Sequence, residues 1–122
     1  MRADDAVFVI SVAARLVGMH ANTLRKYEGA GLLSPARTDG RIRLYSTEDI
    51  NRLRQIQTLS EEQGINVAGI RLALKAGEEI RRLREEVSGN TELRERVPEI
   101  QRKLISRLDR VLDQLELSVG EG

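Results

Sequence analysis

The sequence contains no cysteine and only one histidine, His20. Without cysteine there can be no disulfide, no thiolate metal site and no thiol redox switch, and a lone histidine argues against other metal sites. The sequence also offers no Ser/His/Asp set suited to nucleophilic catalysis, and no glycine-rich phosphate loop between a strand and a helix. We therefore expect no metal, no cofactor and no enzymatic activity.

Aromatic residues and long apolar runs are scarce as well. The 122 residues include only three aromatic side chains, Phe8, Tyr27 and Tyr45. A core must therefore be built from Leu, Ile, Val and Ala, which suits helices. No apolar run approaches the roughly 20 residues that cross a membrane. The acidic residues near the start do not fit a signal peptide, and we expect a cytoplasmic protein.

The charges are unevenly distributed, although the net charge is only +1. Residues 11–57 carry eight Lys or Arg and four Asp or Glu, a net charge of +4, whereas residues 58–122 carry eleven and thirteen, a net charge of −2. A basic first half and a balanced second half favour nucleic acid as the partner of the first and protein as the partner of the second.

Two short helices separated by a glycine turn are predicted in the first half, over residues 11–17 and 20–28. Ser11 is an acceptable N-cap for the first helix, and Gly18 can adopt the left-handed conformation that ends it. Leu24 can pack the second helix against the first. This arrangement is a helix-turn-helix, whose second helix enters the major groove of DNA.

The second helix carries two cations and an aromatic hydroxyl on about two turns. Arg25 can read guanine with both terminal nitrogens, and Lys26 is better suited to phosphate. In isolation a solvated helix face would be the favoured explanation of the two cations, but the helix-turn-helix around them favours contact with DNA. Tyr27 fits the core and a phosphate contact equally well. The candidate DNA contacts on this helix are Asn22, Thr23, Arg25, Lys26 and Tyr27.

A small β-hairpin, or wing, is predicted over residues 34–45. Asp39-Gly40 is a tight-turn signal with short extended arms on either side. Arg43 is the favoured phosphate or minor-groove contact, and Tyr45 is expected to pack beneath the wing. The candidate DNA contacts in this segment are Arg37, Arg41, Arg43 and Tyr45.

Further helices follow the wing. Ser46, followed by acidic residues, caps a third helix that ends at Gly64, and Asn66 caps a fourth. Gly77 either bends the fourth helix or separates it from the segment that ends at Val87.

A last helix is predicted from Pro98 to Leu117, after a break over residues 88–90. Its apolar stripe needs a partner. The chain's own fourth helix is one candidate, but an identical chain is favoured, which predicts a homodimer. The expected dimerisation residues are Ile100, Leu104, Leu108, Val111, Leu112 and Leu115.

The expected fold class is therefore mainly α. A winged helix-turn-helix DNA-binding head with a small β-hairpin wing is expected over residues 7–76. It is followed by a helical coiled-coil dimerisation arm over residues 77–117. Flexible ends are expected over residues 1–6 and 118–122.

Several of these stretches, in this order, resemble the MerR family of transcription regulators. The matching stretches lie within residues 9–59; they are residues 10–13, 23–28, 31–33 and 43–46, followed by Asp49. Residues 7–14 and 57–70 also resemble the HspR branch of that family, the heat-shock repressors. One departure is Met19-His20-Ala21, because family members often have Ser or Pro near the start of this helix.

The resemblance implies a homodimer whose two heads are joined by an antiparallel coiled coil. It also implies repression from inverted-repeat operators in double-stranded DNA upstream of chaperone genes, with the Hsp70 chaperone DnaK as co-repressor. Two other functions stay open. One is an adaptor whose MerR-like head binds a chaperone or co-chaperone instead of DNA, and the other is a MerR-type regulator of another stress response or of nitrogen status.

Overall fold

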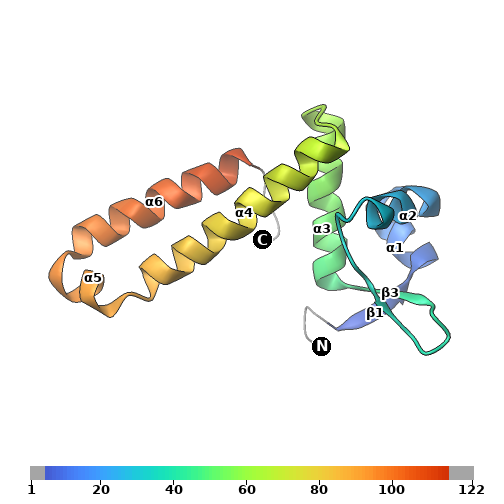
Figure 1. The fold of residues 1–122 in the computed structure, drawn as a ribbon, viewed down its shortest axis with the longest axis horizontal. Coiled ribbons are helices and arrows are strands. Elements are labelled where there is room, and N and C mark those ends of the chain that lie inside the picture. Colours follow the sequence, from blue (N-terminus) through green and yellow to red (C-terminus); the bar gives the residue numbers. More distant parts are fainter. Residues whose placement is uncertain (1–4, 116–122) are drawn as a thin grey trace. The chain divides into compact units, whose positions relative to one another are not determined.

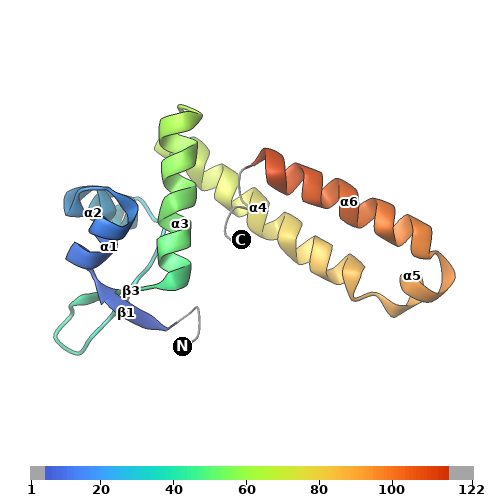
Figure 2. The same cartoon turned by 180° about the vertical axis from the view of Figure 1, so that it is seen from behind.

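The computed structural model describes residues 5–115, which form two compact units divided between Arg71 and Leu72. We call the first unit the head and the second the arm (Figures 1 and 2). In chain order the elements are β1 (Ala6–Val9), α1 (Ile10–Val17), α2 (Ala21–Gly29), β2 (Ala36–Arg37), β3 (Arg43–Ser46), α3 (Thr47–Gln57), the π-helical turn η1 (Thr58–Glu62), α4 (Val67–Ser88), α5 (Thr91–Arg96) and α6 (Pro98–Gln114).

The predicted helix-turn-helix is present as α1 and α2. Gly18 ends α1 with a φ of 68°, in the left-handed region that glycine adopts without steric cost. Leu24 is fully buried and packs α2 into the head. Ser11 is not the N-cap, because β1 runs directly into α1 and the helix begins at Ile10. His20 occupies the N-cap position of α2 in an extended conformation and makes no side-chain capping bond.

A three-stranded antiparallel sheet of order β1-β3-β2 completes the head. The hairpin of β2 and β3 is the predicted wing, but the sequence does not predict β1. Ala6, expected to lie in a flexible end, pairs with Ser46, and Phe8 pairs with Tyr45. The four residues of β1 are too few for an alternating pattern to indicate a strand, and the segment becomes a strand because it pairs with β3.

The turn of the wing differs from a tight turn centred on the Asp39-Gly40 pair alone. The backbone N–H of Arg41 donates to the carbonyl of Thr38 (2.8 Å), and the N–H of Thr38 donates to the carbonyl of Ile42 (3.0 Å). The positive φ falls on Arg41, at 63°, and not on Gly40. The left-handed position at the wing tip is therefore occupied by a cationic side chain, which costs some backbone strain.

α3 begins as the sequence predicts. Ser46 Oγ accepts the N–H of Asp49 (3.0 Å), and the Asp49 carboxylate accepts the N–H of Ser46 (2.9 Å), which completes a capping box. Asn66 accepts the N–H of Gly69 (2.9 Å) at the start of α4. The largest fully buried side chains of the head are Leu24, Leu32, Tyr45, Leu53, Ile56 and Ile70.

In the arm, α4 and α6 lie side by side and run in opposite directions (Figures 1 and 2). α4 is continuous through Gly77 and ends at Ser88, the first residue of the predicted break. The sequence does not predict α5, a six-residue helix in which the side chain of Asn90 caps the N–H of Leu93 (2.8 Å). α6 begins at Pro98 and ends at Gln114; its predicted end at Leu117 lies outside the described residues.

Polar contacts join α6 to α4 within the arm. Gln101, only 6% exposed, donates from Nε2 to the carbonyls of Val87 (2.8 Å), Ser88 (3.3 Å) and Asn90 (3.3 Å). The guanidinium of Arg84 pairs with the carboxylate of Asp109. α6 therefore has a partner within its own chain, which is the alternative that the sequence analysis did not favour.

Candidate nucleic-acid interface

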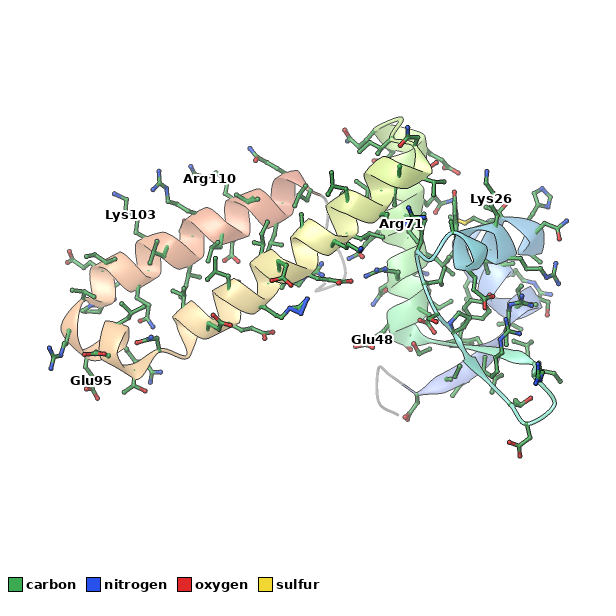
Figure 3. The ribbon with its side chains drawn as sticks, in the orientation of Figure 1. Lys26, Glu48, Arg71, Glu95, Lys103 and Arg110 are labelled. Atoms are coloured by element: carbon green, nitrogen blue, oxygen red, sulfur yellow. The ribbon has the colours of Figure 1, made fainter. Side chains whose placement is uncertain are left out.

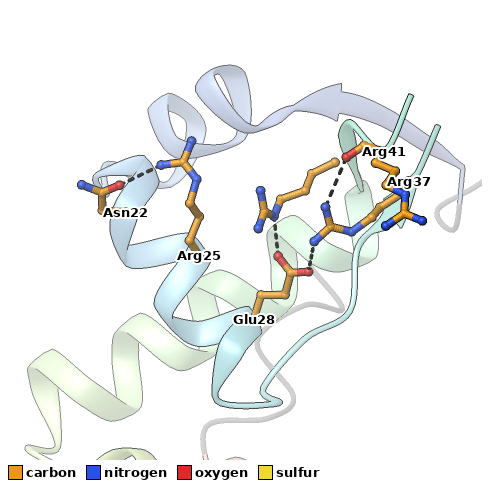
Figure 4. A network of polar contacts seen from close by, with 6 residues as sticks. Asn22, Arg25, Glu28, Arg37 and Arg41 are labelled. Carbon is orange, nitrogen blue, oxygen red and sulfur yellow. Dashed lines mark hydrogen bonds and ion pairs between the residues drawn. The ribbon is translucent and has the colours of Figure 1, made fainter. Parts of the chain in front are cut away.

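The exposed face of α2 carries three of the side chains proposed for DNA contact. Asn22, Arg25 and Lys26 are exposed, Thr23 is half-buried, and Tyr27 is buried. Lys26 points outward from α2 in Figure 3. Asn22 Oδ1 accepts a hydrogen bond from Arg25 Nη1 (2.7 Å), as Figure 4 shows. This bond leaves the rest of the guanidinium fork of Arg25 for an outside acceptor and limits its rotation.

Glu28, in the last turn of α2, binds two arginines of the wing (Figure 4). Its Oε2 accepts from Arg37 Nη2 (2.7 Å), and its Oε1 accepts from Arg43 Nε. Arg37 and Arg43 are directly paired in the sheet, so the two guanidinium groups approach the same carboxylate from adjacent strands. One carboxylate thus connects the second helix of the helix-turn-helix with both strands of the wing.

The environment of Glu28 favours its charged form. Burial on its own would raise the pKa of the carboxyl, but hydrogen bonds from Arg43 and Arg37 and the charges of these arginines outweigh burial and lower the pKa below its ordinary value. Conversely, the hydrogen bond to Glu28 raises the pKa of Arg43. The bridge is therefore ionic at neutral pH.

The three wing arginines have different surroundings. Arg37 uses a second nitrogen, Nη1, to donate to the backbone carbonyl of Arg41 (3.2 Å), so it spans from Glu28 to the wing tip. Arg43 uses only Nε, and its terminal nitrogens make no hydrogen bond to residues 5–115. The exposed side chain of Arg41 likewise has no polar partner in that range.

The two tyrosines of the candidate set belong to the core. Tyr45 is fully buried, as expected for a residue that packs beneath the wing, and Tyr27 is 8% exposed. The hydroxyl of Tyr45 has no hydrogen-bond partner among the described residues, and burial raises its pKa. Both rings therefore lie inside the head and not on its exposed surface.

Two further arginines bind backbone carbonyls at the end of α2 and just beyond it, and the sequence did not single them out. Arg52, on α3, donates from Nε to the carbonyl of Leu32 (2.9 Å). Arg71 donates from its guanidinium to the carbonyl of Ala30, the C-cap residue of α2. Nothing local marks these residues, because both act on carbonyls more than 19 positions away in the chain.

Glu28 is also a residue to which the sequence assigned no role. It is the only acidic residue between Ala6 and Thr38, within a basic segment. A single acid among cations is a usable signal for a structural ion pair, but the identity of its partners depends on the wing folding back onto α2.

The proposed dimerisation stripe is divided between a covered and an exposed part. Leu112 is 4% exposed in the arm, and Leu108 and Leu115 are half-buried. The members that stay exposed in the single chain are Ile100, Leu104 and Val111. Lys103 and Arg110 point away from α4 (Figure 3).

Residues 5–115 hold no cluster of three or more His, Cys, Asp or Glu side chains arranged to bind a metal ion. Over the same residues, no helix combines the length and the apolar character that a membrane crossing requires.

Comparison with protein families matches residues 8–77 to the MerR HTH family of regulatory proteins. The chain belongs to the MerR family. The resemblance seen in the sequence is thereby confirmed, and the winged helix-turn-helix head is the part that carries it.

Individual relatives fit this assignment. Over 80 residues the chain is 51% identical to a protein named as the heat shock protein HspR of Streptomyces coelicolor. The matched region covers 66% of this chain and 53% of that protein. It is 38% identical over 73 residues to the HTH-type transcriptional regulator GlnR of Bacillus cereus, and the match covers 60% of this chain and 56% of GlnR. It is 28% identical over 110 residues to the HTH-type transcriptional regulator YfmP of Bacillus subtilis, covering 87% and 79%.

The chain spans about half the length of the first two of these relatives. The matches to transcriptional regulators support DNA-binding transcriptional regulation as the role of this chain.

Proposed function

We propose that this protein is a sequence-specific repressor that binds an inverted-repeat operator in double-stranded DNA as a homodimer. The observation that carries the proposal is the cationic surface of the head, where Arg25 and Lys26 on α2 lie next to a wing that Glu28 holds against the same helix. A helix in the major groove and an arginine-bearing wing on the flanking backbone are the two contacts that such a surface fits.

The arm supports the homodimer. Ile100, Leu104 and Val111 form one exposed apolar line along α6 at spacings of four and seven residues. Leu83 on α4 is also exposed. Covering these side chains with a second copy removes them from water, and it places two heads on one palindromic site, where each head alone would bind weakly.

Chaperone genes are the proposed targets, with DnaK as co-repressor. The 51% identity with HspR over 80 residues supports a stress-response role. The co-repressor rests on the resemblance to the HspR branch alone.

The test is a footprint on the DNA upstream of the protein's own gene and of chaperone genes, with and without purified DnaK. Protection of an inverted repeat that strengthens with DnaK is the expected result. Binding to DnaK without protection of any duplex would instead support the adaptor function.

A further inference from the structure

Glu28 presents an electrostatic problem for a DNA-binding surface. An acid close to phosphates repels them, so a merely solvated glutamate at this position would weaken binding. Yet Glu28 lies on the same helix as Arg25 and Lys26, with its side chain 18% exposed. A favourable effect elsewhere must offset the repulsion between Glu28 and the phosphates. The two contacts of Glu28 with arginines indicate what that effect is.

The wing has little support of its own. β2 is two residues long and pairs only with β3, and the tip is closed by a few backbone hydrogen bonds. Glu28 ties both strands to α2 through Arg37 and Arg43, and Arg37 carries the connection on to the carbonyl of Arg41. β3 is also held by its pairing with β1, but among residues 5–115 the hydrogen bonds that join the wing to α2 all go to this one carboxylate.

The contacts also separate the roles of the two arginines. Arg37 has Nη1 and Nη2 both engaged within the head, so it serves as a strut. Arg43 binds Glu28 through Nε alone. Its two terminal nitrogens, Nη1 and Nη2, are left to donate hydrogen bonds to two oxygens of one phosphate. The carboxylate of Glu28 thus orients Arg43 toward a DNA phosphate, and through Arg37 it stabilises the turn of the wing.

We propose that Glu28 is a positioning residue of the DNA interface, which sets the wing against α2 and orients Arg43 toward a backbone phosphate. The inference rests on the proposed DNA-binding function. It goes beyond that function because it assigns an acidic residue a favourable effect on DNA affinity and removes Arg37 from the phosphate contacts.

The test replaces Glu28 by Gln, which removes the charge and leaves one acceptor oxygen where two are needed. Operator affinity should fall by roughly tenfold, equivalent to about 1.4 kcal/mol, because the wing loses its anchor. Asp39→Asn is the matched control: it neutralises an exposed acid of the same wing that has no polar partner among residues 5–115. The control should bind DNA as tightly as the wild type or more tightly.

Two further measurements distinguish positioning from charge alone. In the Arg37→Gln protein, E28Q should have a smaller effect than in the wild type, because part of its action passes through Arg37. Without DNA, the amides of Thr38 and Arg41 should exchange hydrogen several-fold faster in E28Q than in the wild type. If E28Q does not fold, Glu28→Asp, whose shorter side chain cannot span both arginines, is measured in the same way.

Equal or tighter operator binding by folded E28Q would overturn the inference, as would unchanged exchange at the wing. A wild-type protein that binds no duplex would overturn the proposed function, and the exchange experiment would still decide whether Glu28 positions the wing.

Discussion

Glu28 and Arg43 are joined by an ion pair between the last turn of α2 and the first residue of β3, fifteen positions apart in the chain. The two side chains are 18% and 26% exposed. Such a pair is more protected from solvent than the exposed ion pairs of the arm, such as that of Arg96 with Glu92. It connects the element proposed to read bases with the element proposed to hold the backbone.

The pH dependence of stability should report the ionisation of Glu28. Its pKa in the folded protein lies below the ordinary value of 4.5. Its contribution is therefore fully present above that value and is lost as the pH falls through the lower folded pKa. We expect wild type to be more stable than E28Q in urea denaturation at pH 7, with the difference shrinking below about pH 4.5. A difference that stayed constant down to pH 3 would contradict the ionic bridge.

Arg43 and Arg37 should differ in their effect on the salt dependence of DNA binding. Arg43→Gln removes a phosphate contact, so the slope of log K against log salt should become shallower by about 0.9 per head. Arg37→Gln removes a strut, so affinity should fall while the slope stays nearly unchanged. Binding isotherms at several salt concentrations measure both. Equal slope changes in the two variants would mean that both arginines bind phosphate.

The head was largely predictable from sequence because its signals are local. Gly18 marks the turn, and Ser46 with Asp49 forms the capping box of α3. The features of the head that the sequence did not predict depend on contacts between residues far apart in the chain. β1 is a strand because β3 lies beside it, and Glu28 acquires its role only when the wing folds over α2.

The arm shows the same limit. The apolar stripe on α6 was evident, but the sequence alone does not show which of its members α4 covers. Gln101 is an example. It is a polar residue at a buried position of α6, and the reason is evident only from the structure, where its amide donates to the carbonyls at and just after the end of α4.

Gln101 should stabilise the arm. Gln101→Ala removes the donor shared by three carbonyls and leaves a small void, so the free energy of unfolding should fall by about 1–3 kcal/mol. Gln114→Ala, at an exposed position of the same helix, is the control and should change it by less than about 0.5 kcal/mol. Urea denaturation monitored by circular dichroism compares the two. Equal stabilities would show that the buried amide contributes nothing to the arm.

The exposed apolar line on α6 should control dimerisation. Replacing Ile100 and Leu104 together with Glu puts two charges where an identical surface is proposed to bind, and sedimentation should show a helical monomer. Lys103→Glu with Ser106→Glu places the same residue type on other exposed positions of α6 and should leave a dimer. A wild-type protein that is already monomeric at micromolar concentration would refute the dimer proposal.

The most direct test of DNA recognition by α2 is an anisotropy titration of wild type and Arg25→Ala on two labelled duplexes. One duplex carries the region upstream of the protein's own gene, and the other has the same base composition in shuffled order. Wild type should prefer the first, and Arg25→Ala should lose about 1–3 kcal/mol of that preference per base contact while keeping the wild-type circular dichroism spectrum. An Arg25→Ala protein that discriminates between the duplexes as well as wild type would contradict the assignment of α2 as the recognition helix.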